Sequence, residues 1–210
     1  DFYSRVVTKA GFRLAVIDVG SIALINASSM HKLTHTNNIQ TYVNVGAHTT
    51  NIHMLKDGVT TFMRELSLGG ELANQCIAQN PNCTDIPAVE IEDTKIRLCG
   101  GCSNKALQVD EAVKSAYATI ATEIKKSLDF FEATTLNVEV GNIHLSGGVA
   151  NDDRFREALE MKTECRVHCW NPLEAFGWNV PFRTTEDLYG VQSQASSMAI
   201  AVGCALRYNY

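Results

Sequence analysis

The sequence predicts an α/β fold in which a mixed sheet is flanked by helices. Segments with strand and helix patterns alternate along the 210 residues instead of forming two separate blocks. Residues 42–66 predict three consecutive strands in an antiparallel meander, and residues 107–133 form the longest stretch with helical periodicity. We therefore expect a sheet built around the meander and backed by one long helix.

The N-terminal part predicts one strand and one helix. Arg13–Val19 is mostly apolar, which is typical of a buried strand. Ser21–Ala27 follows as a helix, with Ser21 as the expected N-cap, because a serine oxygen accepts a hydrogen bond from the first free backbone N–H groups. His31–Gln40 is polar and indicates a connector.

The meander has clear turn signals. Its first strand, beginning at Tyr42, ends in the small-residue loop Gly46–Thr50. Asp57-Gly58 then separates two apolar runs, which strongly predicts a hairpin. Gly69-Gly70 leads into a helix that continues to Gln79.

The later elements continue the alternation of helices and strands. The apolar residues of the long helix recur at three- and four-residue spacing, which gives one buried stripe. We expect a charged helix at Val89–Leu98, the long helix at Leu107–Ala133, a strand at Val138–Ser146, a helix at Arg154–Met161 capped by Asn151 or Asp152, a strand at Arg166–Cys169, an irregular stretch at Asn171–Gly190 and a last helix at Ser193–Tyr208.

Composition excludes some classes of protein. An apolar content of 45% and a charged content of 20% are ordinary for a globular chain. A net charge of −5 gives no electrostatic attraction to nucleic acid or to an anionic membrane surface. No apolar run approaches the roughly 20 residues of a membrane-spanning helix. We expect no nucleic-acid partner and no direct membrane span.

The number of cysteines, seven, is odd, which argues against a complete disulfide framework. Cys99-Gly-Gly-Cys102 has the spacing of half a zinc site, and Cys165 with Cys169 could supply the other half. The same cysteines also fit a redox pair, or a surface thiol pair together with small buried side chains. We expect no metal here.

Two strand–loop junctions indicate a nucleotide cleft. The loop after the first meander strand, Gly46-Ala47-His48-Thr49-Thr50, leaves backbone N–H groups free to form a concavity that suits phosphate. Farther along, the strand Ile143–Ser146 leads through Gly147-Gly148 into a helix, whose N-terminus favours negative charge. A cleft between two lobes requires two such junctions.

These segments resemble the actin-like ATPase superfamily, and within it the group of type IV pilus assembly proteins related to PilM and FtsA. The phosphate-2 pattern of that family is Asp-x-Gly-x-x-x-Thr, a hairpin, then Phe-x-Arg and Gly-Gly. The matching residues here are Gly46, Thr50, Phe62, Arg64, Gly69 and Gly70. Further segments match in order: Ala10–Phe12 with Val16–Val19, Ile91–Lys95, Leu145–Gly148, Asn171-Pro172 and Ala199–Arg207.

The resemblance implies an actin-like (ribonuclease H-like) ATPase fold and a nucleotide site. Glu92 and Lys95 would meet the ribose or the base, and Gly147, Gly148 and Val149 would lie against adenine. His48 is more simply explained as a solvent-facing residue than as a general base. The full set of expected nucleotide-binding residues is Asn44, Gly46, Ala47, His48, Thr49, Thr50, Gly69, Gly70, Glu92, Lys95, Gly147, Gly148 and Val149.

Asn44 stands where the family has an aspartate that helps to hold the water shell of Mg²⁺. The amide keeps an oxygen acceptor but lacks the charge that hard cations favour. Either the site binds nucleotide and hardly hydrolyses it, or Asn44 is only a polar residue at a strand end and the site is inactive. We assign no catalytic residue, and the protein is not clearly an enzyme.

The resemblance also implies an incomplete fold. No first phosphate loop occurs before Gly11, so we interpret the chain as a C-terminal fragment. Residues 1–39 would be a remnant of lobe 1, 40–192 would form lobe 2, and 193–210 would return to lobe 1. Lobe 2 would contain the meander, a small subdomain around 71–106, the long helix and the adenosine-motif strand and helix. ATP with Mg²⁺ is expected in the full-length protein, and no bound nucleotide in this fragment.

The resemblance favours a scaffold of type IV pilus assembly at the cytoplasmic face of the inner membrane. Its implied partners are the short cytoplasmic tail of a PilN-like membrane protein and other pilus platform proteins. Three alternatives remain open: a small-molecule kinase of the same superfamily, the cytoplasmic domain of a type II secretion platform protein, and an FtsA-like filament protein. Asn44 argues against the kinase, because phosphoryl transfer needs a well-held metal ion.

Overall fold

The structure is a computed structural model that describes residues 2–30, 39–135, 138–174 and 185–207, with the backbone alone for 185–189. Its five-stranded sheet has the order β3-β2-β1-β4-β5. β2 pairs antiparallel with β1 and β3, whereas β4 pairs parallel with β1 and β5. The strands are β1 Gln40–Val45, β2 Thr50–Lys56, β3 Val59–Leu66, β4 Asn142–Gly147 and β5 Arg166–Cys169. The predicted mixed sheet and meander are confirmed.

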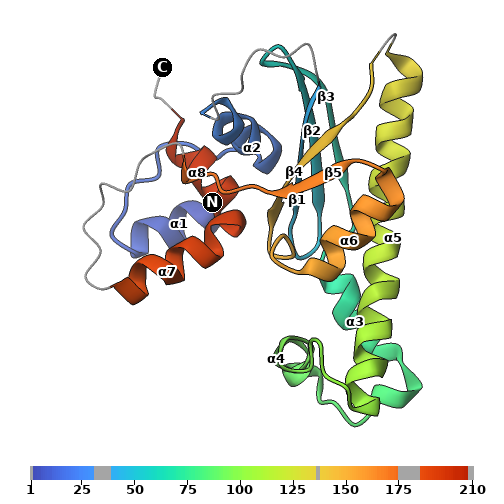
Figure 1. Cartoon of the computed structure of the whole chain (residues 1–210). Helices are drawn as coiled ribbons and strands as arrows, with labels where there is room; N and C mark the ends of the chain where they lie inside the picture. Colours follow the sequence, from blue (N-terminus) through green and yellow to red (C-terminus); the bar gives the residue numbers. More distant parts are fainter. Residues whose placement is uncertain (1, 31–38, 136–137, 175–184, 208–210) are drawn as a thin grey trace.

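Helices cover both faces of this sheet and extend below it (Figure 1). The α-helices are α1 Phe2–Lys9, α2 Gly20–Ser29, α3 Glu71–Gln79, α4 Ile91–Arg97, α5 Asn104–Thr134, α6 Asp153–Thr163, α7 Thr185–Gln194 and α8 Ala199–Ala205. Short 3₁₀ turns are η1 Pro81–Cys83, η2 Ala88–Glu90 and η4 Ala195–Met198. α5 and α6 lie on one side of the sheet, and α2 and α8 lie on the other.

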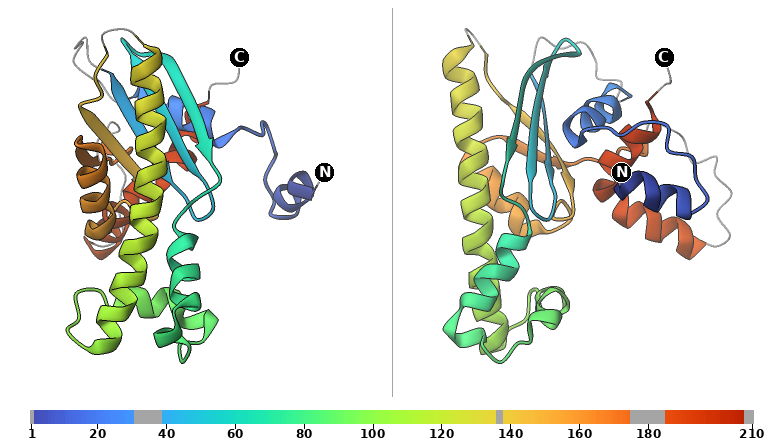
Figure 2. Two further views of the ribbon diagram at one scale, coloured as in Figure 1. Left: turned by 90° about the vertical axis from the view of Figure 1, so that its right-hand side faces the viewer. Right: turned by 180° about the vertical axis from the view of Figure 1, so that it is seen from behind.

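The larger core lies between the sheet and α5, which runs along it (Figure 2). Val43, Ile52 and Leu145 of the sheet and Val113 and Ile120 of α5 are fully buried in it. The helix begins three residues before the predicted start, because the Ser103 hydroxyl accepts a hydrogen bond from the Ala106 N–H at 3.1 Å. The predicted long helix is confirmed.

The opposite face of the sheet carries a smaller core and a polar layer. Leu24 of α2 packs with Tyr42, Trp170 and Ala199 in this smaller core. At the loop end of the strands the side chains become polar, and the Ser21 hydroxyl donates to the Asn51 side-chain oxygen at 2.6 Å. α2 and α8 come from opposite ends of the chain and meet here. The division into 1–39, 40–192 and 193–210 stays a prediction.

Four expectations about single elements are wrong. Arg13–Val19 forms no strand: no described strand pairs with it, and its apolar residues Ile17 and Val19 are 69% and 59% exposed. Ser21 is not an N-cap: α2 begins at Gly20, and the Ser21 hydroxyl is bonded to Asn51 instead. The fourth strand begins at Asn142 rather than Val138, and the last helix is divided between η4 and α8.

The stretch expected to be irregular, Asn171–Gly190, lies partly outside the described residues, and α7 begins within it. That helix has weak amphipathic character, because it is built from TEDLYGVQSQ with a central glycine. Its sequence therefore gives little sign of a helix.

Burial of His53 makes the stability of the fold sensitive to pH. Its Nε2 is hydrogen-bonded to the Thr60 hydroxyl at 2.9 Å, and its buried Nδ1 has no partner in the described part of the chain. Burial lowers the pKa of His53 to about 4. His53 therefore stays neutral in the folded protein at pH values below ~6.5, where the imidazole of the unfolded chain binds a proton.

We expect the free energy of unfolding to be fully retained above pH ~6.5 and to fall by roughly 2–3 kcal/mol as the pH drops toward 4.5. Urea unfolding across this range measures the change. His53→Gln keeps a donor for Thr60 and has no titrating ring, so its pH dependence should be flatter. Equal slopes for both proteins would contradict the assignment.

Candidate functional site

A cavity of about 550 Å³ lies beside the loop ends of β1 and β4. Its walls come from the β1–β2 loop, the turn after β4, the start of α3, and α4, α5 and α6. The volume lies within the range of small-molecule sites, ~300–1,000 Å³. The cavity is where the two predicted loops converge.

The β1–β2 loop is fixed to the start of α3. The Gly46 N–H donates to the Thr49 carbonyl oxygen at 2.9 Å and closes the loop. The Gly70 N–H donates to Gly46 O, and the Glu71 N–H donates to Ala47 O, both at 2.9 Å. These bonds place the loop and the first turn of α3 along one side of the cavity.

The turn after β4 is joined to the end of β1. Gly147 has φ +99°, and a Cβ there would lie 2.1 Å from the Val45 carbonyl oxygen, so only glycine fits. The next residue, Gly148, donates its N–H to that same oxygen at 3.0 Å. The backbone of Gly148 and the side chain of Val149 thereby reach the cavity.

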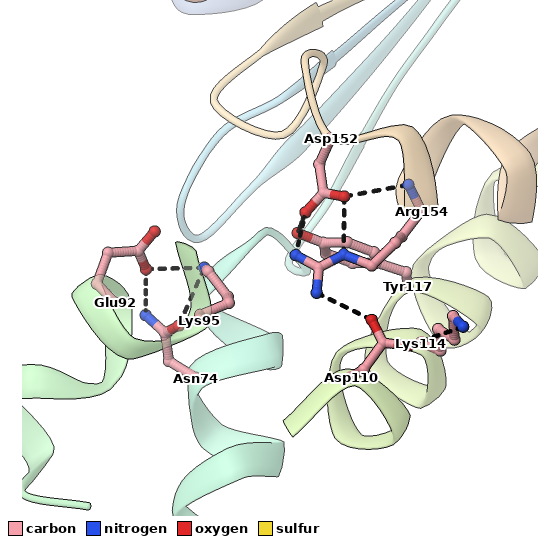
Figure 3. A network of polar contacts seen from close by, with 8 residues as sticks. All are labelled: Asn74, Glu92, Lys95, Asp110, Lys114, Tyr117, Asp152 and Arg154. Atoms are coloured by element: carbon pink, nitrogen blue, oxygen red, sulfur yellow. Dashed lines mark hydrogen bonds and ion pairs between the residues drawn. The ribbon is translucent and has the colours of Figure 1, made fainter. Parts of the chain in front are cut away.

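Asn74, Glu92 and Lys95 form the first polar cluster of the cavity (Figure 3). Lys95 Nζ donates to Glu92 Oε2 at 2.8 Å and to Asn74 Oδ1 at 3.1 Å, and Asn74 Nδ2 donates to Glu92 Oε2 at 2.9 Å. Burial raises the pKa of Glu92, but the bonds from Lys95 and Asn74 outweigh it and lower that pKa. The cluster presents a fixed carboxylate that can accept hydrogen bonds from hydroxyl groups.

The second cluster centres on Arg154, at the start of α6 (Figure 3). Its guanidinium donates to Asp152 from Nε at 2.9 Å and Nη2 at 2.7 Å, and from Nη1 to Asp110 at 3.1 Å. The buried Tyr117 hydroxyl also donates to Asp152, at 3.0 Å. Burial raises the pKa of both aspartates, but their hydrogen bonds and the neighbouring cations lower it overall.

The sequence reasoning missed Asn74, Asp110, Tyr117 and Arg154. It found Asp152 only as an N-cap, which the structure confirms, because Asp152 Oδ1 accepts from the Arg154 N–H at 3.1 Å. Asp110 and Arg154 are 44 residues apart, so no local pattern joins them. The one available signal was the charged run Asp152-Asp153-Arg154 directly after the glycine turn.

The structure brings part of the predicted site together. Of the predicted residues, those that line the cavity are Gly46, Ala47, Gly70, Glu92, Lys95, Gly148 and Val149. The predicted residues outside its lining are Asn44, His48, Thr49, Thr50, Gly69 and Gly147. Gly69 lies against the backbone of Ala47, and Gly147 is the glycine that joins the two loops. His48 is exposed, as expected of a solvent-facing residue.

Two of the expected roles need correction. Thr50 is fully buried and its hydroxyl donates to the Leu68 carbonyl oxygen at 2.8 Å, so this hydroxyl is not available to a phosphate. Asn44 does not face the cavity: it is 6% exposed, and its side-chain oxygen accepts from the Ser146 hydroxyl at 3.1 Å. It belongs to the polar layer beneath α2, because neighbouring residues of a strand alternate between the faces of the sheet.

The site fits a nucleoside better than a metal ion. A flat base can lie against Gly148 and Val149, with sugar hydroxyls toward Glu92. In the described part of the chain, no three His, Cys, Asp or Glu side chains are gathered where they could hold a metal ion. Mg²⁺ would therefore have to be held mostly by phosphate oxygens and water, as is common for this ion.

Comparisons with known proteins agree with this fold. The family described as Type IV pilus assembly protein PilM matches residues 3–209. A solved PilM-PilN type IV pilus biogenesis complex has a TM-score of 0.74 and 23% identity, covering 95% of this chain and 55% of that one. The ethanolamine utilization protein EutJ from Carboxydothermus hydrogenoformans has a TM-score of 0.62 and 18% identity, with coverages of 97% and 59%.

MreB5 of Spiroplasma citri bound to AMPPNP has a TM-score of 0.60 and 10% identity, covering 98% of this chain and 62% of that one. Among curated protein sequences, no significant match was found. The predicted actin-like fold and the family resemblance are confirmed. The chain spans just over half of the solved PilM chain, 55%.

We expect Arg154→Leu to lower the free energy of unfolding by about 2–4 kcal/mol at pH 7, because it removes the cation shared by two partly buried carboxylates, which leaves Asp152 without an ion-pair partner and Asp110 with Lys114 alone. Both aspartates have lowered pKa values, so their stabilising effect is present above the unfolded pKa of ~3.9 and is lost as the pH falls below it. The deficit of the variant should therefore shrink toward pH 3.

Arg156→Leu is the matched control, because Arg156 pairs with Asp153, whose side chain is 71% exposed. Arg156→Leu should change the free energy of unfolding by no more than about 0.5 kcal/mol. Denaturant unfolding at pH 7 and pH 3 measures both variants. A small loss for Arg154→Leu, independent of pH, would contradict the role given to the network.

Proposed function

Since this chain belongs to the family of the type IV pilus assembly protein PilM, we propose that it serves pilus assembly as a nucleotide-binding scaffold. The observation that carries the proposal is the cavity, where two glycine loops and a fixed carboxylate converge. Because the chain spans 55% of the solved PilM chain, the ligand and partners proposed below refer to the whole protein.

The cavity supports a nucleoside as the ligand. The Glu92 carboxylate is held by Lys95 and Asn74, so it is preorganised to accept hydrogen bonds from two sugar hydroxyls. Gly148 carries no side chain, and a Cβ there would meet nothing within 4 Å, which leaves room for a base against the backbone. The loop 46–49 borders the start of α3, and the N–H groups of Gly46, Gly70 and Glu71 are already bonded within the protein, so a phosphate would have to be met by the remaining N–H groups of this loop.

The proposed role is ligand binding with little hydrolysis. When bound, ATP with Mg²⁺ would supply a phosphoryl group activated for transfer. Asn44 carries no charge, and its oxygen is already bonded to Ser146, so it offers little to a metal ion. Thr50 offers no hydroxyl to a water at the phosphate loop, because its hydroxyl donates to the Leu68 carbonyl oxygen. The nucleotide would act as a structural or switching ligand.

A PilN-like tail is the proposed protein partner, at the cytoplasmic face of the inner membrane. The support is the family match, together with the fold shared with PilM of the PilM-PilN complex. No described helix is both long enough and apolar enough to cross a bilayer.

Lys95→Met tests the nucleoside site. Loss of the ammonium frees the Glu92 carboxylate, and a hydrogen bond to a charged group contributes about 1.5–3 kcal/mol. The dissociation constant for ATP should therefore rise roughly tenfold or more. Calorimetric titration of the whole protein measures this dissociation constant. In a separate test of slow hydrolysis, ATP incubated with the wild-type protein should remain mostly triphosphate.

Lys126→Met is the matched control, because Lys126 also pairs with a glutamate three residues away, on the exposed face of α5. Its affinity for ATP should equal that of the wild type. If both variants bind ATP like the wild type, or if the wild type binds none, the cavity is not the nucleotide site.

A further inference from the structure

The turn between α4 and α5 contains Cys99-Gly-Gly-Cys102, a motif that the proposed function does not use. Both cysteines are free thiols with exposed side chains. Cys99 also lines the cavity, on the same side as Glu92 and Lys95 of α4. We propose that Cys99 and Cys102 form a redox-active dithiol, which small disulfides convert to a Cys99–Cys102 disulfide.

The backbone between the two cysteines reverses direction. The Gly101 N–H donates to the Leu98 carbonyl oxygen at 3.0 Å, and the Cys99 N–H donates to Ile96 O at 3.3 Å. Gly100 has φ +72°, a conformation that side chains rarely adopt. The Leu98–Gly101 turn contains Cys99, and the two glycines between the cysteines give the backbone the freedom that a Cys99–Cys102 disulfide needs.

The other cysteines lack this arrangement. Cys83 and Cys165 are buried, and the Cys165 thiol donates to the Val140 carbonyl oxygen at 2.9 Å. Cys169 is exposed, but its thiol is bonded to Asn151. In the described part of the chain no third ligand joins Cys99 and Cys102, so a disulfide fits this pair better than a zinc ion, which requires four ligands.

The reaction consumes one molecule of a small disulfide such as oxidised glutathione. The Cys99 thiolate attacks one sulfur of that disulfide, its S–S bond breaks, and one glutathione leaves as thiolate. The Cys102 sulfur then attacks Cys99 of the mixed disulfide and releases the second glutathione. The two thiol protons pass to the two released thiolates, so the cysteine pair is oxidised by two electrons.

The disulfide would change the cavity, an effect that rests on the proposed function. α4 has only seven residues, and its lining residues Glu92 and Lys95 lie within two turns of Cys99. Closing the disulfide tightens the turn at the C-terminal end of α4. We expect this to move the carboxylate cluster and weaken nucleotide binding about three- to tenfold.

Peptide mapping tests the dithiol directly. The whole protein is equilibrated with reduced and oxidised glutathione, its thiols are alkylated, and it is digested with trypsin. Cleavage after Arg97 and Lys105 gives the peptide Leu98–Lys105, which contains both cysteines and no others. We expect an unalkylated peptide two hydrogens lighter than the reduced form, reversed by dithiothreitol. Two glutathione adducts or two alkylated thiols under oxidising buffer would overturn the proposal.

One further measurement tests the coupling. Hydrogen exchange of residues 91–97 should differ between the oxidised and reduced wild type, and not in the double variant Cys99→Ser, Cys102→Ser. Cys169→Ser, which removes an exposed thiol outside the motif, should behave like the wild type. If the reduced protein binds no ATP, the nucleotide proposal fails, whereas the peptide and exchange results still decide the dithiol.

Discussion

The site depends on the backbone contact between the ends of β1 and β4. The Gly148 N–H donates to the carbonyl oxygen of Val45. That oxygen lies so close to Gly147 that a side chain at position 147 would not fit. Because the two strands are parallel, their following loops leave the sheet at the same edge. The bonds from Gly70 and Glu71 to the first loop, and the cap at Asp152, then fix α3 and α6 around that edge. This junction positions the walls formed by the two loops, α3 and α6, and α4 and α5 complete the cavity.

The sequence was sufficient to predict the elements that are specified by neighbouring residues. The Asp57-Gly58 hairpin and the long periodic helix were both predicted, because turn chemistry and apolar spacing act within a few residues. Arg13–Val19 has the composition of a buried strand, yet composition does not supply a pairing partner, and none of the described strands pairs with it. Asn44 was predicted on the correct strand, but its hydrogen bond to Ser146 comes from a residue 102 positions away.

The candidate site was predictable to the extent that it consists of glycines and of the helix pair Glu92 and Lys95. Its other charged cluster was not, because Asp110, Tyr117 and Arg154 come from two helices far apart in the chain. Both cations of the cavity, Lys95 and Arg154, are already paired with carboxylates. A ligand therefore meets preformed hydrogen-bonding groups rather than a free positive charge. Binding would also hold α3, α4 and α6 together, which stabilises the folded state.

We propose that the cavity is the nucleoside half of a nucleotide site. A crystal structure of the whole protein with a non-hydrolysable ATP analogue would test this directly. We expect density for the base beside Gly148 and Val149, with the sugar hydroxyls at the Glu92 carboxylate. A nucleotide bound elsewhere on the protein, with this cavity filled only by water, would contradict it.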